Sequence, residues 1–271
     1  MPRRHGLATI PDHQRGNSMR RFTFLSALYV SLAALLALSI SSARAAELTV
    51  AFAIAKPPFV YATQIGPAQA DDKGGIELDI MKAALPPRGH SFQAVYSTYD
   101  ALTALVLDGR ADAAATVRPE NPNLFYSNEF VSFHNVAVTR ADGPAPTAVA
   151  DLAGLSMVAW EGATKDLGPA FAEAAGKSPN YAEIGDQKAQ VKAFLDGRFQ
   201  ALIIDGTIFR YWKKVLGGKA ADFQFHSLFG GHTPFVVGFA DETVRNDFNS
   251  GLKEIRQNGV YDVLFNHHIA D

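Results

Sequence analysis

The sequence predicts an α/β protein built from two similar lobes. Segments with strand character alternate with amphipathic helices over residues 48–117, and the alternation starts again after residue 155. This pattern is typical of a mainly parallel sheet covered by helices. Residues 101–116 and 189–204 also match each other, because both read as a helix, a Leu-Asp-Gly-Arg turn and a strand. Helix–Asp-Gly–strand connections are common, so coincidence is the alternative, but the matching positions favour two similar lobes.

Proline and glycine residues mark where the predicted strands and helices of the first series end. Pro57-Pro58 ends the first strand, since proline cannot donate to a β ladder, and Pro86-Pro87 stops the first helix. Gly109 is expected to cap the second helix in the left-handed conformation. The expected elements are a strand over 48–54, a helix over 76–85, a strand over 92–96, a helix over 100–107 and a strand over 111–117.

The second series follows a stretch with two prolines at 142–146. Apolar periodicity again alternates between the strand and helix patterns, and the chain then closes with two amphipathic helices. The expected elements are strands over 155–160, 181–184, 199–204 and 235–240, and helices over 165–175, 187–195, 207–216, 242–257 and 260–267.

Composition limits the function classes. The 271 residues are 48% hydrophobic, which suffices for a packed core, and the length exceeds one typical domain. No cysteine is present, which excludes disulfides, thiolate metal sites, cysteine nucleophiles and a cysteine-linked lipid anchor. No nucleotide-binding or hydrolase motif and no metal-ligand spacing of histidines occurs, so we expect no cofactor, no metal and no catalytic residue. The adjacent His267 and His268 are expected at a solvated terminus.

Residues 1–45 have the parts of a secretory signal peptide. A basic start at Met19-Arg20-Arg21 is followed by an apolar run over 22–40 and by the small-residue ending Ala43-Arg44-Ala45. We expect cleavage after Ala45, with Met19 as a candidate for the true start. A retained membrane anchor is the alternative, because the apolar run is about long enough to span a bilayer.

Removal of this segment makes the protein acidic. The segment holds six of the 25 basic residues and one of the 27 acidic residues, which leaves a formal net charge of −7. An acidic surface repels DNA and anionic lipid, so we expect neither nucleic acid nor membrane as a partner. The mature chain is expected to be a free monomer in the periplasm of a Gram-negative cell.

Candidate ligand-binding residues lie where the two matching strands end. In open α/β sheets, ligands bind beyond the carboxyl ends of the strands. Thr116 and Arg118 stand at the end of the first strand, and Asp205 follows the second. Arginine binds a carboxylate in a bidentate way and aspartate accepts from an ammonium, so an amino acid would fit between them. The alternatives are a solvated loop arginine at 118 and an N-cap for the helix near Thr207 at 205.

Eight short motifs occur along the mature chain in a characteristic order. They are Lys56-Pro57-Pro58-Phe59, Gly75-Ile76-Glu77-Leu78-Asp79-Ile80, Tyr99-Asp100-Ala101-Leu102, Leu107-Asp108-Gly109-Arg110, Phe125-Tyr126-Ser127, Asp151-Leu152-Ala153-Gly154-Leu155, Glu161-Gly162-Ala163-Thr164 and Asn258-Gly259-Val260-Tyr261-Asp262. In order and spacing the mature chain resembles the periplasmic amino-acid-type solute-binding proteins of ABC importers, the family 3 extracellular solute-binding proteins.

The resemblance implies a type II periplasmic-binding-protein fold. Two α/β lobes would be joined by two crossover segments, with a ligand cleft between them. Lobe 1 would comprise residues 46–140 and 237–271, and lobe 2 residues 141–236. Such a protein captures a small polar solute, an amino acid or an amino-acid-like molecule, by lobe closure and delivers it to an ABC transporter membrane permease.

The resemblance also implies roles for single residues. Tyr99 would stack on the ligand, Thr164 would hydrogen-bond its carboxylate and Asp205 would hold its ammonium. Thr164 also stands where a strand turns into a helix, and free N–H groups there favour an anion; an N-cap is the alternative. The family's usual arginine position falls on Glu120, so Arg118 is a substitute by proximity. The ligand could therefore be a different small polar or anionic metabolite.

Glu161 lies beside the Thr164 turn and is a further candidate contact. Because Glu161 could act as an acid, an exported lyase or dehydratase of the same fold is an alternative function. A ligand-sensing module of a membrane receptor is another, and a retained segment at 22–40 would favour it.

Overall fold

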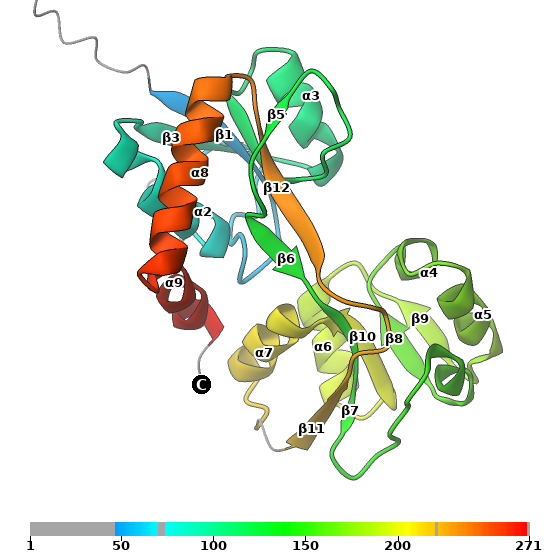
Figure 1. Cartoon of the computed structure of the whole chain (residues 1–271). Coiled ribbons are helices and arrows are strands. Elements are labelled where there is room, and N and C mark those ends of the chain that lie inside the picture. Colours follow the sequence, from blue (N-terminus) through cyan, green and yellow to red (C-terminus); the bar gives the residue numbers. More distant parts are fainter. Residues whose placement is uncertain (1–46, 70–73, 220–221, 270–271) are drawn as a thin grey trace, which may run out of the picture. The chain divides into compact units, whose positions relative to one another are not determined.

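The computed structural model describes residues 47–69, 74–219 and 222–269 (Figure 1). The predicted signal peptide lies outside the described residues. The predicted α/β class is confirmed, because the chain forms two separate sheets with helices packed on them. Within the described ranges, none of the helices combines the length and the apolar composition of a transmembrane span.

The first sheet has the strand order β2-β3-β1-β4-β12-β5, and β6 pairs with β12 off this path. β1 is parallel to both β3 and β4, whereas β12 returns from late in the sequence and runs antiparallel to β4. The strands are β1 (Leu48–Ala53), β2 (Gly66–Pro67), β3 (Phe92–Ser97), β4 (Ala113–Val117), β5 (Phe125–Tyr126), β6 (Val131–Phe133) and β12 (Thr233–Phe239).

The second sheet has the order β11-β7-β10-β8-β9. Its parallel part is β10-β8-β9, and β7 is antiparallel to both β10 and β11. The strands are β7 (Asn135–Arg140), β8 (Met157–Ala159), β9 (Tyr181–Glu183), β10 (Ala201–Asp205) and β11 (Phe223–His226).

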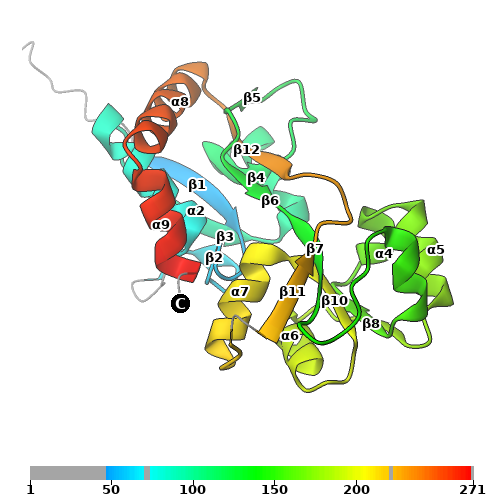
Figure 2. The same cartoon turned by 60° about the horizontal axis from the view of Figure 1, so that its bottom comes forward.

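Helices connect the parallel strands and cover the sheets. α2 packs against α8, and α9 contacts both of them and also α7 (Figure 2). The helices are α2 (Ile76–Ala84), α3 (Leu102–Leu107), α4 (Ala163–Asp166), α5 (Pro169–Lys177), α6 (Gln187–Leu195), α7 (Gly206–Val215), α8 (Glu242–Gln257) and α9 (Val260–Ile269), with 3-10 turns at Pro86–Arg88, Tyr99–Ala101 and Val149–Gly154.

The central strands are buried on both faces, which explains their continuous apolar runs. In β1, Val50 and Phe52 face one apolar cluster, whereas Ala51 and Ala53 face another beneath α3. The same alternation occurs in β10, where Leu202 belongs to the same cluster as Val50 and Ile203 belongs to a third cluster. Strands of a parallel sheet covered on both faces read as unbroken apolar segments for this reason.

The single helix predicted over 165–175 is two helices. Gly168 has a φ of +81°, which ends α4, and Pro169 begins α5 as its first residue. A left-handed residue cannot continue a right-handed helix, and proline is well placed at a helix start. The chain therefore turns sharply between Asp166 and Phe171.

Strand pairing also differs from the predicted lobe limits. β7 lies in the second sheet, although the prediction gives residues up to 140 to lobe 1, because its buried apolar run needs strand partners on both sides. β12 pairs with β6 and β4 from Thr233 onward, although the prediction gives residues up to 236 to lobe 2. The chain thus changes sheets near His134 and near His232, whose rings lie 4.6 Å apart.

Candidate functional site

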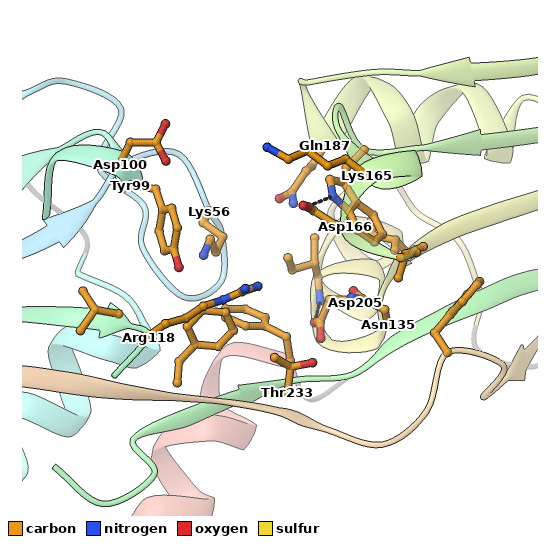
Figure 3. A pocket seen from close by; sticks show the side chains of 18 of the residues that line it. Lys56, Tyr99, Asp100, Arg118, Asn135, Lys165, Asp166, Gln187, Asp205 and Thr233 are labelled. Carbon is orange, nitrogen blue, oxygen red and sulfur yellow. Dashed lines mark hydrogen bonds between the residues drawn. The ribbon is translucent and has the colours of Figure 1, made fainter. Parts of the chain in front are cut away.

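A cavity of about 1020 Å³ is lined by residues attached to both sheets (Figure 3). On the first sheet, the wall includes residues just beyond the carboxyl ends of β1, β3 and β4, namely Lys56, Tyr99 and Arg118. On the second sheet it includes residues at or beyond the ends of β8, β9 and β10, namely Trp160, Gln187 and Asp205. The cavity therefore lies where an α/β sheet offers its ligand-binding edge.

Lys56 is held on this wall by a tight loop after β1. Its N–H donates to the carbonyl of Val60 at 3.1 Å, and the N–H of Val60 donates back at 3.0 Å. The Nζ atom lies 4.5 Å from the ring centroid of Phe133 and 5.5 Å from that of Tyr99. Burial lowers the pKa of Lys56, and the nearby charges of Glu77 and Asp205 act in the opposite direction.

Arg118 and Tyr99 lie beside Lys56 on the same wall (Figure 3). The guanidinium carbon of Arg118 is 5.7 Å from the ring centroid of Phe235, and the Tyr99 ring is 6.5 Å from the same centroid. Burial raises the pKa of the Tyr99 hydroxyl, whereas the adjacent Arg118 lowers it. Tyr99 is 41% exposed, so its ring presents a free surface to the cavity.

Asp205 is buried at the carboxyl end of β10, where it caps α7. Its Oδ1 accepts the N–H groups of Thr207 and Ile208 at 2.8 and 3.0 Å. Its Oδ2 accepts the N–H of His134 at 2.7 Å. Burial raises the pKa of Asp205, and these three hydrogen bonds oppose the increase. Asp205 is therefore an N-cap and also a cavity-wall residue.

Thr164 and Glu161 do not line the cavity. The N–H and the hydroxyl of Thr164 both donate to Oε1 of Glu183 at 3.0 Å, and the N–H of Gly162 donates to its Oε2 at 2.7 Å. The carboxylate of Glu161 lies against Gly185. The protein's own carboxylate thus takes the donors at the start of α4 that were expected to bind a ligand carboxylate.

Glu183 is expected to make stability dependent on pH. Burial acts to raise the pKa of its carboxyl, but hydrogen bonds from Thr164, Gly162 and Tyr181 outweigh it and lower the pKa. A lowered pKa in the folded state means that the stabilisation is present at neutral pH and is lost as pH falls through that pKa. Glu183→Gln should therefore lose about 1–2 kcal/mol of unfolding free energy at pH 7.

Urea unfolding of both proteins at a series of pH values measures this difference. The gap between wild type and Glu183→Gln should narrow below about pH 4, where an unperturbed glutamate takes up its proton. Glu173→Gln is the control, because Glu173 pairs with Lys177 at an exposed position, where solvent screens the pair, and should leave the free energy of unfolding nearly unchanged. An equal gap at pH 3 and pH 7 would contradict the assignment.

Thr116 is fully buried and does not line the cavity. Its Oγ1 and Oε2 of the buried Glu77 both lack a hydrogen-bond partner in the part of the chain that the structure describes. Burial raises the pKa of Glu77, and the charge of Lys56 acts in the opposite direction. Thr116 also has a φ of +57°, which is unusual for a β-branched residue.

Comparison with known proteins supports the architecture. No protein-family model matches the chain, and no curated protein matches it in sequence. Solved structures do match it over most of their length. The ancestral cationic amino acid solute-binding protein AncCDT-1, also described as a precursor of cyclohexadienyl dehydratase, aligns with a TM-score of 0.67, 18% identity and coverage of 82% of this chain and 95% of that chain. The chain has the two-lobed periplasmic-binding-protein fold.

Two further structures with this fold match the chain similarly. The GluR0 ligand-binding core in complex with L-glutamate has a TM-score of 0.63 and 14% identity, over 83% of this chain and 99% of that chain. The substrate-binding protein of an amino acid ABC transporter has a TM-score of 0.56 and 19% identity, over 83% and 99%. The predicted resemblance is thus confirmed as a shared fold, in which each sheet with its helices is one lobe.

The predicted candidates Tyr99, Arg118 and Asp205 line one cavity together with Lys56, which the sequence did not single out as a candidate. An isolated lysine before two prolines is usually a surface residue, and only its position after β1 distinguishes it. The expectation for His268 also needs correction. Its ring bonds the hydroxyl of Tyr61 at 3.0 Å and Asp79 at 2.8 Å, so it belongs to the packed end of α9.

Proposed function

We propose that this protein is the solute-binding component of an ABC importer and works in the periplasm. It captures a small polar solute between its two lobes and delivers it to a membrane permease. The observation that carries the proposal is the cavity of about 1020 Å³ whose wall is formed by strand ends of both sheets. A ligand that contacts both lobes stabilises the closed conformation, in which both walls can touch it. Ligand binding and lobe closure are therefore coupled.

Tyr99, Arg118 and Asp205 are the ligand contacts in this proposal. Each stands at the end of a strand on the cavity wall, two on lobe 1 and one on lobe 2. Two changes of backbone path, near His134 and His232, connect the lobes and would carry the hinge motion. The similar structures that bind amino acids make amino acids the first class of ligand to test.

Tryptophan fluorescence offers a direct test. The chain has two tryptophans, and Trp160 lines the cavity whereas Trp212 lies on α7. In a Trp212→Phe variant, emission comes from Trp160 alone, and a panel of amino acids and organic acids should include a ligand that changes it saturably. Calorimetry should give the same affinity, and small-angle scattering should show a smaller radius of gyration with ligand. If no member of either class binds, the solute-binding proposal is wrong.

An exported lyase is the second candidate. Its basis is the description of AncCDT-1 as a precursor of cyclohexadienyl dehydratase, together with the buried, unpaired carboxyl oxygen of Glu77 near the cavity lysine. Turnover of a prephenate-like acid would support this candidate. Saturable binding of the same acid without any product would favour transport.

A further inference from the structure

The charges on the cavity wall indicate which solutes the site accepts. Three cations line the cavity, namely Lys56, Arg118 and Lys165. Among the ion pairs of the described ranges, none involves any of the three. Instead, Lys56 and Arg118 lie over the rings of Phe133 and Phe235, which hold a cation without neutralising it.

The backbone beside these two cations is strained. In the described part of the chain, the non-glycine residues with positive φ are Ala55 at +58° and Thr116 at +57°. One directly precedes Lys56, and the other stands two residues before Arg118. A left-handed backbone conformation costs free energy at a non-glycine residue, and such residues are concentrated at functional sites. The residues with positive φ therefore lie next to the same two side chains that form no ion pair.

The carboxylates of the wall are less available to a ligand cation. Asp205 already accepts three backbone N–H groups and interacts electrostatically with Lys56. Asp166 accepts the indole N–H of Trp160 at 3.1 Å. Asp100 and Glu120 are exposed, so water and salt screen their charges, as they screen that of the exposed Arg118. The positive charge of Lys56 would also repel a ligand ammonium bound at Asp205.

The remaining wall is rich in aromatic surface. On the lobe 1 side, the ring centroids of Phe133 and Phe235 are 5.2 Å apart, and Tyr99 lies next to Phe235. Trp160 and Phe229 line the other side of the cavity. Aromatic side chains bind flat apolar groups through their faces and edges. The carboxylate of Glu183 accepts the hydrogen bonds of the Thr164 N–H and hydroxyl. These donors are therefore not free to bind a ligand carboxylate.

We propose that the solute is an organic anion, a carboxylate with an aromatic or apolar body and no ammonium group. Its carboxylate lies between Lys56 and Arg118, and its body contacts the rings of Tyr99 and Trp160. This inference rests on the proposed solute-binding function and narrows it. It separates this chain from the similar structures described as binding cationic amino acids.

Three compounds with a phenylethyl skeleton test the charge preference in the wild-type protein by calorimetry. 3-Phenylpropanoate carries only the carboxylate, L-phenylalanine carries both charges and 2-phenylethylamine carries only the amine; L-arginine is the fourth probe. We expect 3-phenylpropanoate to bind at least about tenfold more tightly than L-phenylalanine, because one unmatched charge changes affinity by about that factor or more. The amine and L-arginine should show no saturable binding.

Variants of the two cations test the position of the carboxylate. Arg118→Gln and Lys56→Gln should each weaken 3-phenylpropanoate binding at least about tenfold, and Arg118→Lys should weaken it less. Arg110→Gln and Lys82→Gln are matched controls at exposed positions away from the cavity and should bind as wild type. Circular dichroism checks that each variant is folded, and the wild-type comparison does not depend on any variant.

The outcomes separate the two proposals. L-phenylalanine or L-arginine binding as tightly as 3-phenylpropanoate, or more tightly, would overturn the anion inference and leave the solute-binding function standing. Unchanged 3-phenylpropanoate affinity in folded Arg118→Gln and Lys56→Gln would overturn the carboxylate position. If none of the four probes binds, the anion inference is wrong, and if the wider panel also gives no binder, so is the solute-binding function.

Discussion

Gly251→Ala should lose about 3 kcal/mol of unfolding free energy. A β-carbon at residue 251, in the middle of α8, would lie 2.2 Å from the carbonyl oxygen of Ala84 and 2.8 Å from its carbonyl carbon. Those atoms belong to the end of α2 and cannot rotate away, so the two helices must separate. Thermal unfolding should show a midpoint lower by about 6–12 °C for a chain of this size.

A second glycine in the same chain provides the control. Gly176 lies in α5, is exposed and has open space where a β-carbon would be placed. Alanine has the higher helix propensity, so Gly176→Ala should gain up to about 1 kcal/mol. If Gly251→Ala were also neutral or stabilising, the close contact between α8 and α2 would be wrong.

Asp205→Ala should lose about 2–4 kcal/mol of unfolding free energy in urea titrations. Loss of the N-cap of α7 accounts for about 1 kcal/mol. The half-buried N–H of His134 also loses its acceptor, which costs up to about 1–3 kcal/mol more. Asp205→Asn keeps one acceptor oxygen and should lose less than the alanine variant.

Asp241 is a matched cap without the additional bond. Its Oδ1 accepts the N–H groups two and three residues later, at Thr243 and Val244, in the same pattern as Asp205. It is exposed, so Asp241→Ala should lose only about 1 kcal/mol. Equal losses at both positions would show that His134 does not depend on Asp205.

The parts of the fold that the sequence predicted are those whose signal is local. The strands around Val50, Ala114 and Leu202 are buried on both faces and therefore appear as apolar runs. The strands that it missed include β5, β6 and β11, which are short, and β2, which contains only Gly66 and Pro67. Their residues become strands because a neighbouring strand offers hydrogen bonds, and nothing in their own pattern requires it.

The candidate site divides in the same way. Arg118 and Asp205 were predicted from their positions after strands and Tyr99 from the family resemblance, and all three line the same cavity. The ligand role expected of Thr164 came from the family resemblance and from its position at the start of a helix. That position is as expected, but the pairing of β8 with β9 sets Ala159 opposite Glu183 and so brings the Glu183 carboxylate to Thr164.

The sequence by itself determined the α/β class, the repeated strand–helix series and the strand ends that carry polar side chains, because burial and turn chemistry act over a few residues. Only the tertiary structure decided which polar groups form hydrogen bonds with one another. Asp205 is compensated by His134, and Thr164 by Glu183, through contacts between residues far apart in the chain. Lys56 and Arg118 form no ion pair within the described residues, and that difference cannot be read from local sequence because it depends on which side chains the sheets bring together.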